Sequence, residues 1–227
     1  MEKIVKEFYV YTFDELEEDV KKRLIAKERE YMQTNYVDFQ LSDDMGSKAS
    51  DLLNDYFGIT SDYLKTYYSL CYCQGDGAMI EFDISIEDIN NKYKVFSDEE
   101  MRFLIDKSVV SKIIIKHNNS HYYHEYTFEI DSDYYNYWNY DEIKDNYNIK
   151  EEDFNTINSR FYKLVDNSIR NCRDNKFAWD IVNMNSELGR YGYECIEYFG
   201  NCSEEEIINS IREQDLMFLE NGDVYNG

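Results

Sequence analysis

Apolar and polar residues alternate with a period of two on both sides of one short turn, which is typical of a β-hairpin. The turn, Gln74-Gly75-Asp76-Gly77, contains an Asp-Gly pair, a strong hairpin signal between alternating apolar positions. We therefore expect a hairpin over residues 67–86. Its alternating positions are Tyr68, Leu70 and Tyr72 before the turn, and Ala78, Ile80, Phe82, Ile84 and Ile86 after it.

A second alternating pair of segments follows over residues 109–130, with a turn at Asn118-Asn119-Ser120. Two hairpins in succession predict a mostly antiparallel sheet. The returning segment carries Tyr122, His124, Tyr126, Phe128 and Ile130. Helices should cover the sheet face that bears Ile80, Phe82, Ile84, Ile113, Ile115, Tyr126 and Phe128.

Apolar residues spaced by three and four predict helices on either side of these hairpins. Near the N-terminus, Thr12 and Glu15 form a capping box for a helix that carries Leu16, Val20 and Leu24 on one face. A second helix is expected over residues 47–57, ended by Gly58. A short helix over residues 98–107 joins the hairpins, with Ser97 as its N-cap.

The C-terminal third is also predicted to be helical. Ser203 and Glu206 form a second capping box, and Gly200 separates its helix from the preceding one. The chain closes with a short hairpin that turns at Asn221-Gly222. An earlier helix starts at Asn148 and Glu151, and one of its faces carries Phe154, Ile157, Phe161, Leu164, Ser168 and Cys172.

Together these elements predict one α+β domain over residues 1–227, in which an antiparallel sheet of two hairpins packs against N- and C-terminal helices. A Tyr- and acid-rich insertion is expected at about 131–149. Hydrophobic residues make up 43% of the chain and aromatic residues 17%, which is enough for a core. Disordered chains lack aromatic residues, so we expect a folded protein despite the high charge.

The chain has no apolar run of about 18 residues and no apolar region near its N-terminus. We therefore expect a cytoplasmic protein, within a bacterial host cell, without membrane contact. Five cysteines are an odd count, and none of them forms a zinc-finger pattern with histidines. Free thiols are expected, with no metal and no cofactor.

The most informative property of the composition is its charge. The chain has 47 acidic and 24 basic residues, for a formal charge of -23. Such a surface repels nucleic acid and anionic lipid, and it fits the basic groove of a protein that holds nucleic acid. We expect no direct contact with nucleic acid.

One segment, residues 129–153, combines nine acidic residues with interleaved Tyr and Trp and only two lysines. Tyr and Trp anchor protein interfaces, and carboxylates pair with the Arg and Lys of a nucleic-acid channel. The alternative is a solvated loop whose tyrosines pack on the sheet. The predicted interface consists of Asp131, Asp133, Tyr134, Tyr137, Trp138, Tyr140, Asp141, Glu142 and Asp145.

A second acidic cluster, residues 194–223, holds nine acidic residues and a single base, Arg212. Capping explains Glu206, and the helix dipole explains Glu204 and Glu205. The other acidic residues either form a face that mimics nucleic acid or serve solubility.

Residues that allow chemistry cluster around the first turn and the histidines. An enzyme would need Gln74, Asp76, Tyr122 and His124 to converge, and a metal or general-base site would need His117, His121 and His124. The alternative readings are a plain hairpin turn, which explains Gly75 and Gly77, and histidines on a strand surface.

Tyr72-Cys73-Gln74-Gly75-Asp76-Gly77-Ala78 resembles the Y-S-Q-G-D-G-A segment of a family of phage and prophage proteins. The opening Thr12-Phe13-Asp14-Glu15-Leu16, the segment His121-Tyr122-Tyr123-His124 and the closing helix with its turn are similar to that family as well. Cys73 and His121 depart from the family's Ser and Arg. The resemblance implies a viral or mobile-element origin, and some members of the family are labelled antitoxin-like.

Charge, aromatic residues and this resemblance together predict a phage-encoded inhibitor of a host defence nuclease, similar in action to an anti-CRISPR protein. It would bind a host nuclease or other nucleic-acid-binding protein stoichiometrically, through an acidic and aromatic surface that mimics nucleic acid. The alternatives are an antitoxin-like binding protein and an enzyme that uses the region of Gln74, Asp76 and His124.

Overall fold

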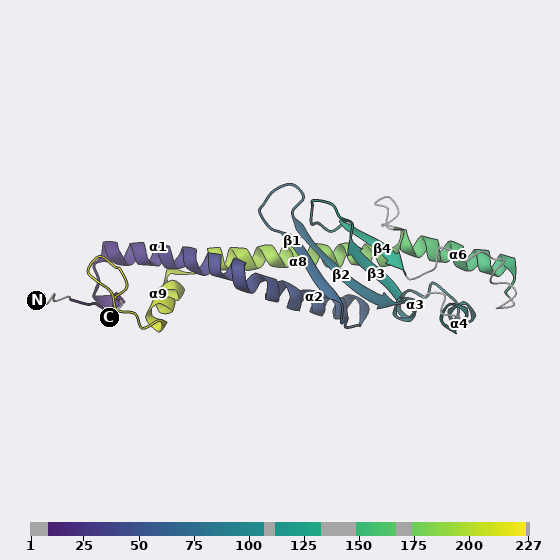
Figure 1. Ribbon diagram of the computed structural model, residues 1–227, viewed down its shortest axis with the longest axis horizontal. Helices are drawn as coiled ribbons and strands as arrows, with labels where there is room; N and C mark the ends of the chain where they lie inside the picture. The colour runs from purple at the N-terminus through teal and green to yellow at the C-terminus, as the bar shows by residue number, and fades with distance from the viewer. Residues whose placement is uncertain (1–8, 107–111, 133–148, 167–173, 226–227) are drawn as a thin grey trace, which may run out of the picture. The chain divides into compact units, whose positions relative to one another are not determined.

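A computed structural model describes residues 9–106, 112–132, 149–166 and 174–225 (Figure 1). It is an α+β fold, as predicted, with one four-stranded antiparallel sheet in the order β1-β2-β3-β4. The strands are β1 Leu64–Ser69, β2 Gly77–Ser85, β3 Lys112–His117 and β4 Phe128–Ser132. The helices are η1 Phe13–Glu15, α1 Glu18–Asn35, η2 Tyr36–Gln40, α2 Leu41–Phe57, α3 Ile86–Tyr93, α4 Asp98–Asp106, α6 Glu151–Val165, α8 Lys176–Gly200 and α9 Glu204–Glu213.

The chain divides into two compact units, which are described separately. The terminal unit consists of Met1–Leu41 and Glu194–Gly227, and the central unit consists of Ser42–Tyr193. The predicted single domain over residues 1–227 and the predicted insertion at about 131–149 stay predictions.

Both predicted hairpins are confirmed, and they lie in one sheet. Tyr67 pairs with Met79 across the first hairpin, and Ile115 pairs with Ile130 across the second. Phe82 pairs with Ile115, which joins the two hairpins through β2 and β3. The first residues of the second predicted hairpin, 109–111, lie outside the described residues.

Several strand boundaries were predicted wrongly. β1 runs from Leu64 to Ser69, so Leu70 and Tyr72 belong to the loop that follows it. β2 ends at Ser85, because the Ser85 hydroxyl accepts a hydrogen bond from the Asp88 amide (3.0 Å) and so caps α3, which begins at Ile86. β4 begins only at Phe128, so Tyr122, His124 and Tyr126 belong to the preceding loop. In that loop the Thr127 hydroxyl donates to the His124 carbonyl (2.7 Å), a local bond that competes with strand pairing.

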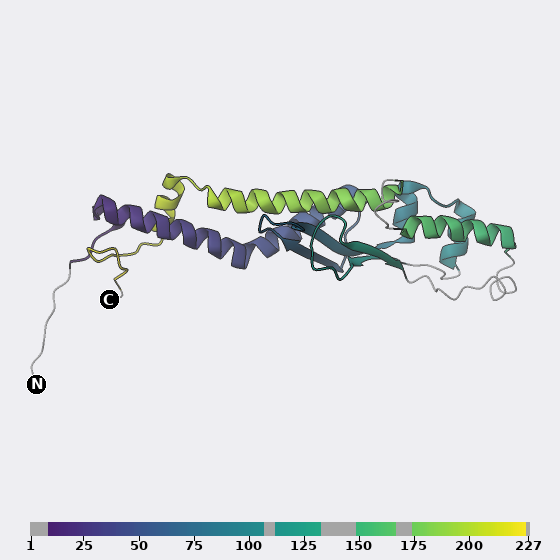
Figure 2. The same ribbon diagram turned by 90° about the horizontal axis from the view of Figure 1, so that it is seen from above.

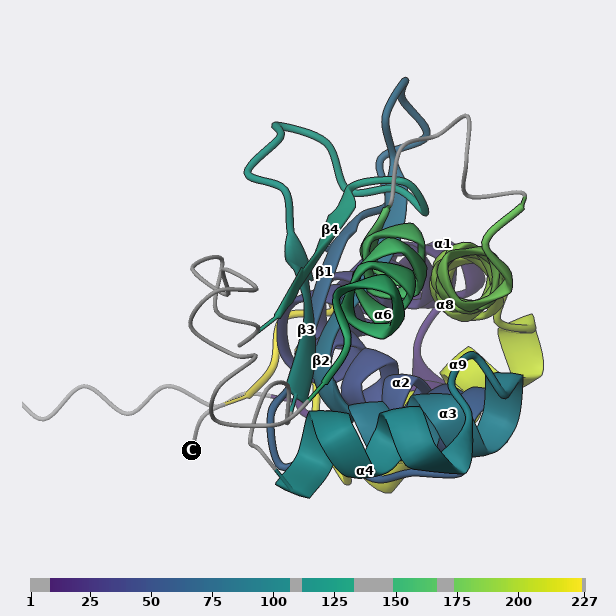
Figure 3. The same ribbon diagram turned by 90° about the vertical axis from the view of Figure 1, so that its right-hand side faces the viewer.

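The core of the central unit lies on one face of the sheet, as predicted. Phe82, Ile84, Ile113 and Ile115 are buried, and α6 and α8 lie on the same side of the sheet (Figure 3). A Cβ on Gly189 of α8 would stand 3.3 Å from the amide nitrogen of Ala78, so the helix backbone lies almost against β2. The predicted position Tyr126 is wrong for this face, because it lies in the loop and is only partly buried.

The predicted helices of the central unit are confirmed, with shifted ends. α2 begins earlier than expected and ends where predicted, at Gly58, whose φ is +70° and whose amide bonds to the Asn54 carbonyl (2.7 Å). α6 begins at Glu151 and ends at Val165; Phe154, Ile157, Phe161 and Leu164 are buried along it. Lys150 is the N-cap of α6, so the predicted cap Asn148 is wrong, and the helix ends before Ser168 and Cys172, which lie outside the described residues. An ion pair between Arg160 and Glu100 (2.6 Å) links α6 to α4, and both helices lie beyond the end of the sheet in Figure 2.

The terminal unit has a core of its own, which includes Leu16, Val20, Ile207 and Phe218. The predicted capping box at Thr12 is present, but it closes a 3-10 turn rather than the helix, which begins at Glu18. Leu16 has extended backbone angles (φ -71°, ψ 156°) and so separates the turn from α1. The remaining predictions here are confirmed: Ser203 and Glu206 cap α9, α8 ends at Gly200, and Phe218 and Val224 pair across the final turn.

Candidate binding surfaces

The carboxylate of Asp76 organises the loop between β1 and β2. It accepts hydrogen bonds from the backbone amides of Cys71 (2.7 Å) and Cys73 (2.8 Å) and from the hydroxyl of Ser69 (2.7 Å). The Cys73 amide, followed by the Ser69 hydroxyl, lowers the pKa of this carboxyl well below its usual range. Asp76 is therefore a charged acceptor that holds the turn.

The two glycines of the same turn allow the second loop to lie against the first. Gly75 has a φ of +93°, and a Cβ there would stand only 2.1 Å from the Tyr122 ring. Gly77 has a φ of +151°, and a Cβ there would stand 3.1 Å from the Cα of His124. The Tyr123 amide also donates to the Gly75 carbonyl (3.2 Å). The motif thus joins the tips of both hairpins, and we call residues 70–76 with 118–127 the hairpin tip.

His117 at the end of β3 and His124 of the hairpin tip make local bonds to the backbone. The Asn119 amide donates to Nδ1 of His117 (3.2 Å), and Nε2 of His117 lies 3.1 Å from the Tyr122 carbonyl. Nδ1 of His124 accepts from the Tyr126 amide (3.2 Å). Throughout the described residues, no group of three or more His, Cys, Asp or Glu side chains is placed to hold a metal ion.

The polar groups of the hairpin tip are therefore used for hydrogen bonds within its own loops. Asp76 is occupied by the amides of its own loop, and among the described residues no hydrogen bond joins it to His124. Two aromatic side chains are exposed there, Tyr72 at 66% and Tyr122 at 54%. The enzyme alternative gains no support from this geometry.

Sequence reasoning missed one residue that contacts the hairpin tip. Tyr193 of α8 donates from its hydroxyl to Asp76 (3.4 Å), and its ring contacts that of Tyr72 at 4.8 Å. Burial, followed by the nearby Asp76 charge, raises the pKa of Tyr193. No pattern connects two residues 117 positions apart in the sequence.

The predicted aromatic and acidic interface lies mostly outside the described residues. Asp133, Tyr134, Tyr137, Trp138, Tyr140, Asp141, Glu142 and Asp145 all fall there. Asp131, at the end of β4, forms an ion pair with Lys116 (2.7 Å), and Lys116 also contacts Glu129 (3.1 Å). Hydrogen bonding to Lys116 lowers the pKa of Asp131. This carboxylate is therefore engaged within the sheet.

The second acidic cluster, residues 194–223, lies within the described residues and belongs to the terminal unit. Its single base, Arg212, forms a bidentate ion pair with Asp14 (2.6 and 3.2 Å). The pair lowers the pKa of Asp14 and links α9 to the turn that precedes α1. The following acidic residues of this cluster are exposed: Glu204, Glu205, Glu206, Glu213, Asp215, Glu220 and Asp223.

Comparisons with known proteins give no family and no relative. No family model, no curated protein and no solved structure matches the chain. Among the described helices, none has the length and apolar character needed to cross a bilayer.

Proposed function

We propose that this protein is a phage-encoded inhibitor of a host defence nuclease, and that it binds stoichiometrically through an acidic surface in place of nucleic acid. It would contact a protein with a basic groove and not nucleic acid itself. The effector nuclease of a CRISPR system is one such target.

The charge of the terminal unit carries this proposal. Residues 1–41 and 194–227 hold 19 of the chain's 47 acidic residues but only 8 of its 24 basic ones. The only base within residues 194–227, Arg212, is engaged by Asp14, so it does not neutralise the exposed carboxylates around it. Carboxylates on α9 and the final turn are thus available to the arginines and lysines of a partner.

The packing of the terminal unit supports a fixed array of charges. α9 begins with the capping box of Ser203 and Glu206 (Ser203 amide to Glu206, 2.8 Å) and buries Ile207 and Ile211. Ser210 and Gln214 of α9 both donate to the Glu28 carboxylate of α1 (3.0 and 2.8 Å). A partner would therefore meet carboxylates at defined positions, which lowers the entropy cost of binding.

The aromatic and acidic segment, residues 129–153, stays a second predicted contact surface. It supplies the Tyr and Trp anchors that exposed carboxylates alone lack. The resemblance to phage and prophage proteins supports a role against host defence.

A pull-down from host-cell lysate at low and high salt tests the proposal. The tagged full chain should retain a nucleic-acid enzyme whose nucleic-acid binding is then blocked. Retention should weaken steeply as salt rises, because charge drives the encounter and salt screens it.

The other outcomes separate the alternatives. If the chain retains a small toxin and neutralises its activity, the proposal is wrong and the protein is an antitoxin-like binding protein. If no protein is retained and the purified chain turns over a small substrate, the proposal is wrong and the enzyme reading takes its place.

A further inference from the structure

A cavity of about 690 Å³ lies in the central unit, between the end of α3, the last turns of α6 and the first turn of α8. Its apolar wall is formed by Tyr93, Val95, Leu164 and Phe177. This volume falls within the range of small-molecule sites in proteins, about 300 to 1,000 Å³.

Basic side chains outnumber acidic ones among the residues that line this cavity. Four basic side chains line it, Lys92, Arg160, Lys163 and Lys176, against two acidic ones, Asp166 and Asp174. The whole chain has a net charge of -23, so an excess of cations around one cavity runs against the general composition. An apolar wall with a few convergent charged groups is typical of a binding site for an organic anion.

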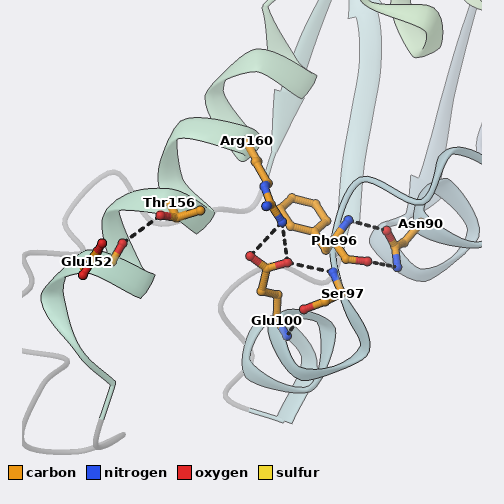
Figure 4. A network of polar contacts seen from close by, with 7 residues as sticks. All are labelled: Asn90, Phe96, Ser97, Glu100, Glu152, Thr156 and Arg160. Atoms are coloured by element: carbon orange, nitrogen blue, oxygen red, sulfur yellow. Dashed lines mark hydrogen bonds and ion pairs between the residues drawn. The ribbon is translucent and has the colours of Figure 1, made fainter.

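The guanidinium of Arg160 is held in place at the rim of the cavity. Its Nη1 donates to both carboxylate oxygens of Glu100 of α4 (2.6 and 2.9 Å), and Glu100 also accepts from the Ser97 amide (2.7 Å) (Figure 4). The Asn90 side chain bonds to both the amide (2.7 Å) and the carbonyl (3.1 Å) of Phe96, which fixes the segment that leads into α4. Arg160 is thus preorganised rather than mobile.

The three lysines at the cavity outnumber the carboxylates with which they form ion pairs. Lys92 and Lys176 share one carboxylate, Asp180, at 3.0 and 3.5 Å, and the Tyr93 hydroxyl donates to it as well (2.6 Å). Lys163 has no ion pair among the described residues. Its position in the last turn of α6 places its charge beside the cavity.

Asn175 connects the two helices that border the cavity. Its side-chain amide donates to the carbonyls of Leu164 (2.7 Å) and Lys163 (3.0 Å), and its side-chain oxygen accepts from the Ala178 amide (3.3 Å). The C-terminal end of α6 is therefore fixed against the N-terminal end of α8.

We propose that this cavity binds a small organic anion, in which a ring-containing apolar body carries one phosphate or carboxylate group. The body lies against Tyr93, Val95, Leu164 and Phe177. The anionic group is bound by Lys163 together with Lys176 and Arg160. This inference is independent of the proposed function, because it concerns a cationic site in the central unit.

Fluorescence titration with anilinonaphthalenesulfonate tests the site, since this probe combines an aromatic body with one anionic group. Phenylnaphthylamine, which has the same body without the charge, serves as the neutral probe. The full chain should bind the anionic probe saturably at one site. Lys163→Gln should weaken that binding about tenfold, because it removes one charge-assisted contact.

Two further variants make the result specific. Lys150→Gln changes the net charge equally at the N-cap of α6, outside the cavity, and it should change affinity for the anionic probe less than twofold. Val95→Trp fills the cavity and should abolish binding of both probes. Circular dichroism and the thermal midpoint verify that each variant is folded.

Three results would overturn the inference. One is the absence of saturable binding of the anionic probe to the wild-type chain. Another is an equal effect of Lys163→Gln and Lys150→Gln. The third is unchanged binding of both probes in a folded Val95→Trp variant.

Discussion

Among single residues, Asp76 shows how one side chain determines the shape of a surface. Its carboxylate accepts hydrogen bonds from backbone amides of a loop in which Tyr72 has a φ of +57° and Gly75 a φ of +93°. Amides that converge on one acceptor stabilise a loop that has no strand partner. The hairpin tip, with exposed Tyr72 and Tyr122, depends on this acceptor being charged.

Replacing Asp76 by Asn should lower the thermal midpoint at neutral pH, because a neutral amide accepts the same bonds more weakly. The pKa of Asp76 is lowered in the folded state, so its stabilisation is present above the ordinary carboxyl pKa. It is lost as pH falls through the folded pKa. The wild-type advantage should therefore shrink below about pH 4.

Asp51→Asn is the matched control, since it removes one charge from an exposed position on α2. Thermal unfolding of both variants is followed by circular dichroism across this pH range. A midpoint that falls equally in both variants would mean that Asp76 has no special role.

At the level of elements, the sequence predicts which helices and hairpins exist better than where they begin and end. The capping pair of Ser203 and Glu206 acts over three residues and needs no tertiary contact, so the sequence contains all of it. The start of β4 depends on how Thr127 bonds to His124 within a folded loop. The approach of Tyr193 to Asp76 depends on the path of α8. The cavity was missed for the same reason, because its cations lie at scattered positions in the sequence.

Asn185 of α8 joins this helix to β2 through a side-chain hydrogen bond, and its replacement measures what that contact contributes to stability. It is fully buried, and its side-chain oxygen accepts from the Ile80 amide (2.9 Å), in a part of β2 beyond the residues paired with β3. Asn185→Leu leaves that amide without its partner. The unfolding free energy, measured by denaturant titration, should fall by about 2–3 kcal/mol.

Asn183→Leu, at a partly buried position of the same helix without a hydrogen bond among the described residues, should change it by less than about 0.5 kcal/mol. An equally small change for Asn185→Leu would show that the contact contributes nothing.

For the whole molecule, net charge is the most informative property of the sequence. The structure shows which acidic side chains are paired within the protein and which are exposed to a partner. Asp131 is engaged by Lys116, whereas the carboxylates of α9 and the final turn surround a single, already paired base. Composition alone does not separate paired from unpaired acidic residues, because pairing depends on which strands and helices lie together.

Competition for nucleic acid tests the central claim most directly. The nuclease retained from host lysate is loaded with labelled duplex DNA, and displacement by the wild-type chain is followed by fluorescence anisotropy. One variant neutralises Glu204, Glu205, Glu213 and Asp215 of the terminal unit. The control variant neutralises four exposed acidic residues of the central unit, Asp43, Asp51, Asp55 and Asp62.

The wild-type chain should displace the DNA at one equivalent, and less effectively as salt rises. The terminal-unit variant should compete at least about tenfold less well, because it loses contacts with phosphate-binding residues. The control should compete nearly as well as the wild type. Equal competition by all three proteins, or equal losses in both variants, would contradict a binding surface on the terminal unit.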